Sequence, residues 1–184
     1  MKYLNKYMFW LLCIILVLST ISCEKDEDNR EYYKSSAPDI PMGASVEIIT
    51  KNSTNLNEYL QIKIGFGQAG NGFTKAALIV KSPDFEIVDS HGNTYISEAN
   101  ITIDDFSADK YVYNRGEPLK SFENFQLKYI GTKTESTGSI VVLVQSLEYK
   151  HDENGHSASA LLSVFYKISN GNIELSTTKF STTN

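Results

Sequence analysis

Two groups of residues carry the side-chain types that metal sites use. The segment IDDFSADK holds Asp104, Asp105 and Asp109, and carboxylates on a loop are ligands that Ca²⁺ prefers. His151 and His156 are the first and last residues of the segment HDENGH and could hold a weakly bound metal together with the acids between them. Neither spacing matches an established metal motif, and turns are rich in these residue types in any case. We therefore expect no metal site, with weak calcium binding by the three aspartates as the open alternative.

The glycine-rich stretch GFGQAG, residues 65–70, matches the GxGxxG pattern of dinucleotide-binding loops. Such a loop must open into a helix, whose N-terminus holds the pyrophosphate. Here Asn71-Gly72 interrupts the chain and a strand-like run follows. We interpret the stretch as a loop between two strands and expect no cofactor. No GxSxG nucleophile motif occurs either, and we expect no enzymatic activity.

Aromatic and basic side chains come together in the stretch DKYVYNRGEP. Tyr111, Tyr113 and Arg115 could present two rings and a guanidinium group to a ligand. Alternation along a short strand would place both rings on one side, where they would serve equally well in a core. These three residues are the candidate ligand-binding site, and core packing of the tyrosines is the alternative.

Another reactive side chain, Cys23, lies at the end of an apolar run near the N-terminus. Lys2 and Lys6 come first, then eleven apolar residues from Met8 to Leu18, then small or weakly polar residues up to Ser22. This is the order of segments in a secretory signal. The apolar run is shorter than the roughly 20 residues that a membrane-spanning helix needs. A spanning helix that extends through Ile21 is the alternative, although Ser19, Thr20 and Ser22 weaken it.

The stretch STISC, which ends in Cys23, resembles the lipobox of bacterial lipoproteins. Ser22 fits the small residue before the cleavage site, whereas Thr20 departs from the leucine that is usual three residues before the cysteine. The resemblance implies a signal peptide over residues 1–22, cleavage before Cys23, and lipid on its thiol. Two or more acyl chains hold a protein stably at a membrane, whereas one chain holds it only marginally. A soluble secreted protein is the alternative.

The charged residues that follow the cysteine, CEKDEDN, are similar to the surface-export signal of Bacteroidota-type lipoproteins. Lys25, Asp26, Glu27 and Asp28 match its pattern of a lysine followed by acids. The resemblance implies display on the outer face of the outer membrane, and a solvated acidic tether is the alternative. The expected location is therefore the cell outer membrane, with the protein lipid-anchored there and exposed at the surface.

The charge of the chain restricts its partners. The 184 residues include 17 basic and 22 acidic ones, for a net charge of −5. Removal of residues 1–22 takes away two lysines and no acid, which leaves a net charge of −7. Because nucleic-acid binding draws on clustered Lys and Arg, we expect no nucleic-acid partner.

With Cys13 removed and Cys23 lipidated, no internal disulfide is available, and an apolar core must hold the domain.

The elements that must position these residues are strands. Strands are expected at residues 45–50, 60–66, 75–81, 85–88, 101–103, 124–129, 139–149, 157–168 and 172–180. The run at 139–149 is apolar on both faces in its middle, which predicts a central strand covered on both sides. Asn-Gly in SNGN, residues 169–172, predicts a tight hairpin, and no window shows the period of a three-turn helix.

Short strands separated by turns predict an all-β fold. We expect residues 23–41 to form a lipidated, acidic, flexible tether. Residues 42–184 should form a single immunoglobulin-like antiparallel β-sandwich of about eight strands, with a lipocalin-like β-barrel as the alternative. The expected function is non-catalytic binding or adhesion, through contact with a protein or a glycan. A structural accessory subunit of an outer-membrane complex is the alternative, and a hydrolase is less favoured.

Overall fold

The computed structural model describes residues 41–150 and 157–181. The predicted signal peptide at 1–22 and all but the last residue of the tether at 23–41 lie outside these residues. So do the predictions for Cys23, Lys25, Asp26, Glu27, Asp28, His151 and His156. Within the described ranges, no helix has the length and apolar character needed to cross a membrane.

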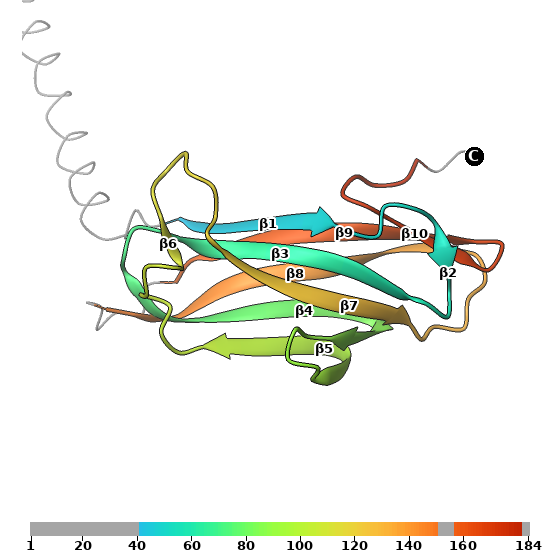
Figure 1. Cartoon of the computed structure of the whole chain (residues 1–184), viewed down its shortest axis with the longest axis horizontal. Coiled ribbons are helices and arrows are strands. Elements are labelled where there is room, and N and C mark those ends of the chain that lie inside the picture. The colour runs from blue at the N-terminus through green and yellow to red at the C-terminus, as the bar shows by residue number, and fades with distance from the viewer. Residues whose placement is uncertain (1–40, 151–156, 182–184) are drawn as a thin grey trace, which may run out of the picture. The chain divides into compact units, whose positions relative to one another are not determined.

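Ten strands make up the regular structure of the described residues (Figure 1). They are β1 (Met42–Ile48), β2 (Thr54–Asn55), β3 (Tyr59–Ala69), β4 (Phe73–Val88), β5 (Thr94–Ile103), β6 (Val112–Tyr113), β7 (Ser121–Tyr129), β8 (Ser136–Tyr149), β9 (Ser159–Ser169) and β10 (Asn172–Ser176). Neighbouring strands pair antiparallel, apart from the short parallel pair of β3 and β6. The prediction of an all-β antiparallel fold is confirmed.

The strands form one curled sheet in the order β1-β3-β7-β4-β8-β9-β10-β2, with β5 added to β4 and β6 to β3. This arrangement fits the class of sandwiches and barrels. The immunoglobulin-like form in particular is not confirmed, since that form consists of two separate sheets and this sheet is continuous.

One long strand, β4, makes the sheet continuous. Residues 73–81 pair with β8, whereas residues 85–88 pair with β7. Pro83 lies between the two halves and has no N–H to give to a ladder, so pairing is interrupted there. The register with β5 also shifts across this bend. Sequence patterns predicted two strands at nearly these positions, and the structure joins them into a single bent strand of 16 residues.

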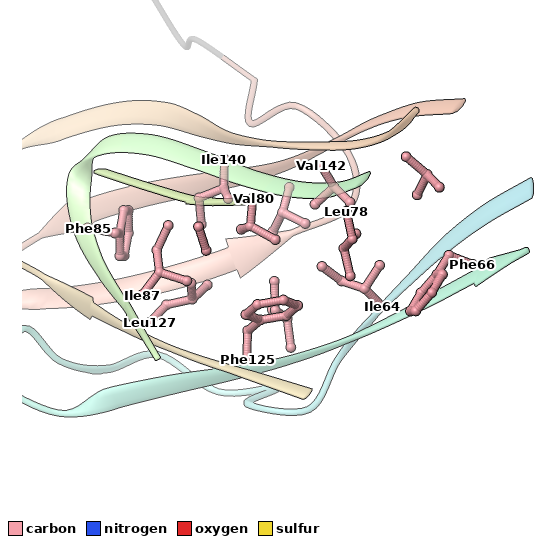
Figure 2. Packing of buried hydrophobic residues seen from close by; sticks show 14 of the residues in the cluster. Ile64, Phe66, Leu78, Val80, Phe85, Ile87, Phe125, Leu127, Ile140 and Val142 are labelled. Carbon is pink, nitrogen blue, oxygen red and sulfur yellow. The ribbon is translucent and has the colours of Figure 1, made fainter. Parts of the chain in front are cut away.

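The core lies between two layers of strands (Figure 2). Ile64, Phe66, Phe125 and Leu127 come from β3 and β7, and they face side chains of β4 and β8. The facing side chains include those of Leu78, Val80, Ile140 and Val142. Each of these eight residues is at most 5% exposed, and burying such a side chain stabilises the fold by about 1.5–3 kcal/mol.

The central strand β8 is fully covered on one face only. Ile140, Val142 and Val144 point into the core and are fully buried, whereas Val141 and Leu143 on the other face are half-buried. The prediction that β8 is covered on both sides is therefore wrong for the described residues. Its apolar character on both faces leaves apolar surface on the outside of the sheet.

The hairpin between β9 and β10 follows the predicted turn chemistry. Asn170 has φ +51° and Gly171 has φ +72°, and both lie between the paired residues Ser169 and Asn172. Positive φ at both central residues is what the preferred two-residue hairpin turns require, and Asn-Gly tolerates it. The strand β10 then ends at Ser176, earlier than the predicted residue 180.

Candidate functional site

An open groove of about 530 Å³ lies between β5 and β7. Residues 101–103 of β5 and residues 121–123 of β7 line it. Successive side chains of a strand point to opposite faces, so a groove lined by consecutive residues follows the edge of the strand. Among the described residues, β5 pairs only with β4, and β7 pairs with β4 only from residue 126 to residue 129. Both strands therefore border the groove with edges that lack a strand partner.

The groove exists because β4 ends early. Val88, its last residue, pairs with Gln126, and the turn at residues 89–93 then leads back into β5. The first half of β7 consequently extends past β4 and pairs with β3 alone. The turn borders one end of the groove, where the backbone N–H and hydroxyl of Ser90 donate to the carboxylate of Glu123. The segment at residues 104–111 borders the other end.

The floor of the groove is apolar. Phe66, Leu78 and Ile103 belong to the core and also line the groove. The ring of Tyr111 stacks on Phe66 and on Phe106, with ring centroids 5.7 Å and 5.2 Å apart. These core side chains are almost completely covered, since Phe66 is 5% exposed and Leu78 is fully buried, so the hydrophobic core closes the bottom of the groove.

The rim of the groove is predominantly acidic. Asp104, Asp105 and Glu123 line it together with one lysine, Lys110. The carboxylate of Asp104 forms an ion pair of 2.6 Å with Lys75. The other two carboxylates outnumber Lys110 and leave a small excess of negative charge, which favours cationic groups.

Asp89 holds the turn at the first end of the groove. Its side chain is 6% exposed. One carboxylate oxygen accepts from the backbone N–H groups of His91 at 2.9 Å and Asn93 at 2.8 Å. The other accepts from the Asn93 amide at 2.8 Å and the Tyr95 hydroxyl at 3.1 Å. Burial acts to raise the pKa of Asp89, but these hydrogen bonds outweigh it and hold the pKa below its usual value.

We expect the stability that Asp89 contributes to be lost in acid. Because its pKa is lower in the folded state, this contribution is complete above the unfolded pKa of about 3.9 and declines as the pH falls through the folded pKa. Asp89→Asn should lower the free energy of unfolding by about 1–3 kcal/mol at pH 7 and flatten its dependence on pH below 4. Urea denaturation from pH 7 to pH 2.5 measures both effects. The exposed Asp109→Asn is the control, and equal acid slopes for Asp89→Asn and the unchanged protein would contradict the prediction.

The three residues predicted to bind a ligand lie in different surroundings. Tyr111 lines the groove and is half-buried. Tyr113 lies in β6 and packs over glycine backbone, since a Cβ atom on Gly43 would lie 2.4 Å from its hydroxyl oxygen. Arg115 is exposed in the turn that follows and does not line the groove. Of the three, Tyr111 alone belongs to the lining.

The GFGQAG stretch is not a loop, which corrects our interpretation. Gly65 and Gly67 lie inside β3, where a Cβ atom on Gly67 would lie 2.6 Å from the carbonyl oxygen of Tyr111. That carbonyl accepts from the backbone N–H of Gln68 at 2.9 Å. Gly67 therefore allows the segment that follows β5 to approach β3 closely.

Gln68 joins two segments near the second end of the groove, and sequence patterns gave no sign of it. Its side chain is fully buried, and the amide nitrogen donates to the carbonyls of Phe73 at 2.7 Å and Phe106 at 2.8 Å. Its amide oxygen accepts from the backbone N–H groups of Gly72 at 3.1 Å and Phe73 at 2.8 Å. One side chain thus fixes the turn between β3 and β4 to the segment that carries Tyr111.

The aspartates considered for calcium do not form a ligand set. Asp104 pairs with Lys75, and Asp105 accepts from the hydroxyl of Ser107 at 3.2 Å. Across residues 41–150 and 157–181, no three His, Cys, Asp or Glu side chains gather closely enough to hold a metal ion.

Comparison with known proteins identifies no family. No protein-family model matches the chain, and no curated protein matches it. Among solved structures, AvmM, which catalyses macrocyclization in alchivemycin A biosynthesis, aligns with a TM-score of 0.41 at 10% identity, over 71% of this chain and 89% of AvmM. The structural-genomics target SoR45 aligns with a TM-score of 0.27 at 16% identity, over 74% of this chain and 92% of that one. Likenesses this low support no inference about function.

Proposed function

We propose that this protein is a lipid-anchored protein of the outer membrane that binds a protein or glycan, without catalysis, in the groove between β5 and β7. The construction of the groove carries the binding part of the proposal. Its apolar floor, with Phe66 and Leu78, lies beneath charged rims that include Asp105 and Glu123. Binding sites commonly combine an apolar concavity with a few polar groups that orient the ligand.

The anchoring part of the proposal rests on the N-terminal sequence. Cys23 follows a signal-like segment, and residues 25–28 follow the cysteine with the charges of a surface-export signal. A domain with its own core, such as that of residues 41–150 and 157–181, suits display on a tether, because lipid can then provide the attachment.

The polar residues of the groove support binding without catalysis. Ser90, His91 and Glu123 lie together, and the hydroxyl of Ser90 donates to Glu123 and lies 3.4 Å from His91 Nδ1. In a hydrolytic triad the histidine stands between the serine and the acid, so that it can take the proton of the serine. Here the serine stands between the other two, and its proton is directed to the carboxylate.

A structural accessory subunit of an outer-membrane complex is the second candidate, and the outer face of β8 and β9 favours it. Leu161 of β9 is 65% exposed and pairs with Leu143 of β8, which is half-buried and faces the same side as the half-buried Val141. Contiguous exposed apolar side chains mark interaction surfaces in native proteins.

Filling the groove tests the proposed binding function. Ser121→Trp places an indole in the groove, and Asn124→Trp places one on the other face of β7 as the control. We expect a glycan array and a displayed library of ten-residue peptides to yield at least one ligand of the full chain. Binding of that ligand should fall at least tenfold in Ser121→Trp and stay unchanged in Asn124→Trp. The proposal is overturned if no ligand distinguishes the two variants.

A further inference from the structure

We infer that the ligand of the groove is an extended peptide with basic residues, which adds to the free edge of β5 as a further strand. This inference rests on the proposed function, because it names the class of ligand for the same groove. Addition of a strand to an exposed sheet edge is an established mode of peptide recognition, in which main-chain hydrogen bonds supply affinity.

The edge of β5 is open to pairing. This strand is ten residues long, and within the described part of the chain its only strand partner is β4. Proteins usually protect such an edge with proline, lysine or a bulge. Residues 99–103, with the sequence ANITI, contain no proline and no charge, and their pairing with β4 is regular. The half of β5 that borders the groove thus lacks these protections.

The floor of the groove suits the side chains of an added strand. A strand beside β5 would lie about 4.8 Å from it and continue its alternation of faces. Every second side chain would then point inward, next to Ile101 and Ile103 and above Phe66 and Leu78. The intervening side chains would point to solvent, as Asn100 and Thr102 do. A peptide in which apolar and polar residues alternate therefore fits the groove, with its apolar side chains buried and its polar side chains in solvent.

The acidic residues of the rim favour basic residues near the two ends of the peptide. Asp104 is held by Lys75, whereas Asp105 and Glu123 accept hydrogen bonds from neutral serine residues. Their negative charges are therefore available to a ligand. The carboxylate of Glu123, in β7, accepts from Ser90 in the turn before β5, and Asp105 follows the end of β5, so basic side chains near both ends of a peptide would find an acid.

The surroundings of Tyr111 favour a peptide over a glycan. Sugar-binding platforms need an aromatic face that is free for stacking. The ring of Tyr111 already stacks on Phe66 and Phe106, and Nζ of Lys110 lies 4.8 Å from its centroid. These contacts occupy the ring of Tyr111. The exposed ring of Phe122, which also lines the groove, has Nζ of Lys63 at 4.4 Å from its centroid.

Backbone methylation of the ligand tests strand addition. Peptides enriched from the ten-residue library on the full chain are resynthesised with N-methyl groups on the even or on the odd residues. Methylation removes the N–H donors of one edge and keeps every side chain. We expect one pattern to weaken binding at least tenfold and the other to leave it within about threefold, because only one edge faces β5. Bound peptide should also slow amide hydrogen exchange at residues 99–103.

The outcomes separate this inference from the proposed function. Peptides that lose affinity in Ser121→Trp but tolerate both methylation patterns overturn strand addition and keep the groove as a binding site. If no peptide is enriched and a glycan binds with an affinity that falls in Ser121→Trp, the peptide ligand is overturned and the groove remains a binding site. Absence of any ligand sensitive to Ser121→Trp overturns both proposals.

Charge reversal on one loop tests the basic character of the ligand. Asp105→Lys should weaken the enriched peptides at least fivefold at low salt, and the difference should shrink as salt is added. Asp109→Lys, on the same loop but outside the groove lining, is the matched control. Equal effects of the two reversals would overturn the assignment of basic residues to the ligand.

Discussion

Replacement of Gln68 by leucine should destabilise the domain severely, and more than replacement of Asp89 by asparagine. Leucine keeps much of the volume but leaves two backbone carbonyls and two backbone N–H groups without the partner that Gln68 provides. A buried polar group without a partner costs about 1–3 kcal/mol, so we expect a loss of about 4 kcal/mol or more. Since small domains are stable by only about 5–15 kcal/mol, this change should leave the protein close to unfolding.

Urea denaturation of the full chain measures this loss. The matched control is Gln61→Leu, the same substitution at an exposed position of the same strand, and it should change stability by less than about 0.5 kcal/mol. Midpoints that coincide for the two variants would show that the hydrogen bonds of Gln68 contribute little.

Replacement of Cys23 by serine should release the protein from the membrane. The lipid that the sequence implies on this thiol contributes about 0.8 kcal/mol for each buried CH₂ group, and a serine cannot carry it. We expect the unchanged protein to remain in the membrane fraction until detergent is added. The variant should appear in the soluble fraction, or else keep its signal peptide uncleaved. Cell fractionation with mass spectrometry of the N-terminal peptide distinguishes these forms.

Cys13→Ser provides the control for this experiment. Cys13 lies inside the apolar run, so its loss should leave both cleavage and membrane attachment unchanged.

Replacement of residues 25–28 by uncharged residues should keep the attachment and abolish removal of the protein by protease added to intact cells. An unmodified thiol at Cys23 in the native protein would contradict the anchoring proposal.

Local patterns predicted most of the strands because alternation is a local property of the chain. Residues 60–66 fall inside β3, and the hairpin of Asn170 and Gly171 lies where its turn residues predict it. Their positions depend on the backbone and on side chains nearby in sequence. The same reasoning failed for β8, because whether a second layer covers an apolar face depends on the rest of the fold.

The groove could not be predicted, because it depends on where strands distant in sequence stop pairing. Val88 ends its strand opposite Gln126, 38 positions later in the sequence, and only that pairing leaves the first half of β7 free. Gln68 shows the same difficulty, since one of its partners is the carbonyl of Phe106, also 38 positions away. Residue type and sequence neighbours singled out Tyr111, whose ring lines the groove and also packs on Phe66 and Phe106; ligand binding by it stays a prediction.

The passage of β4 from one layer of strands to the other affects the rate of the proposed ligand binding and its cost in conformational entropy. A strand that is hydrogen-bonded to both layers prevents them from sliding apart, so the width of the opening between them is set before any ligand arrives. Little conformational entropy of the receptor then remains to be lost on association, and affinity can follow from a small contact area. Association should also proceed in a single kinetic phase, without a slow rearrangement of the protein.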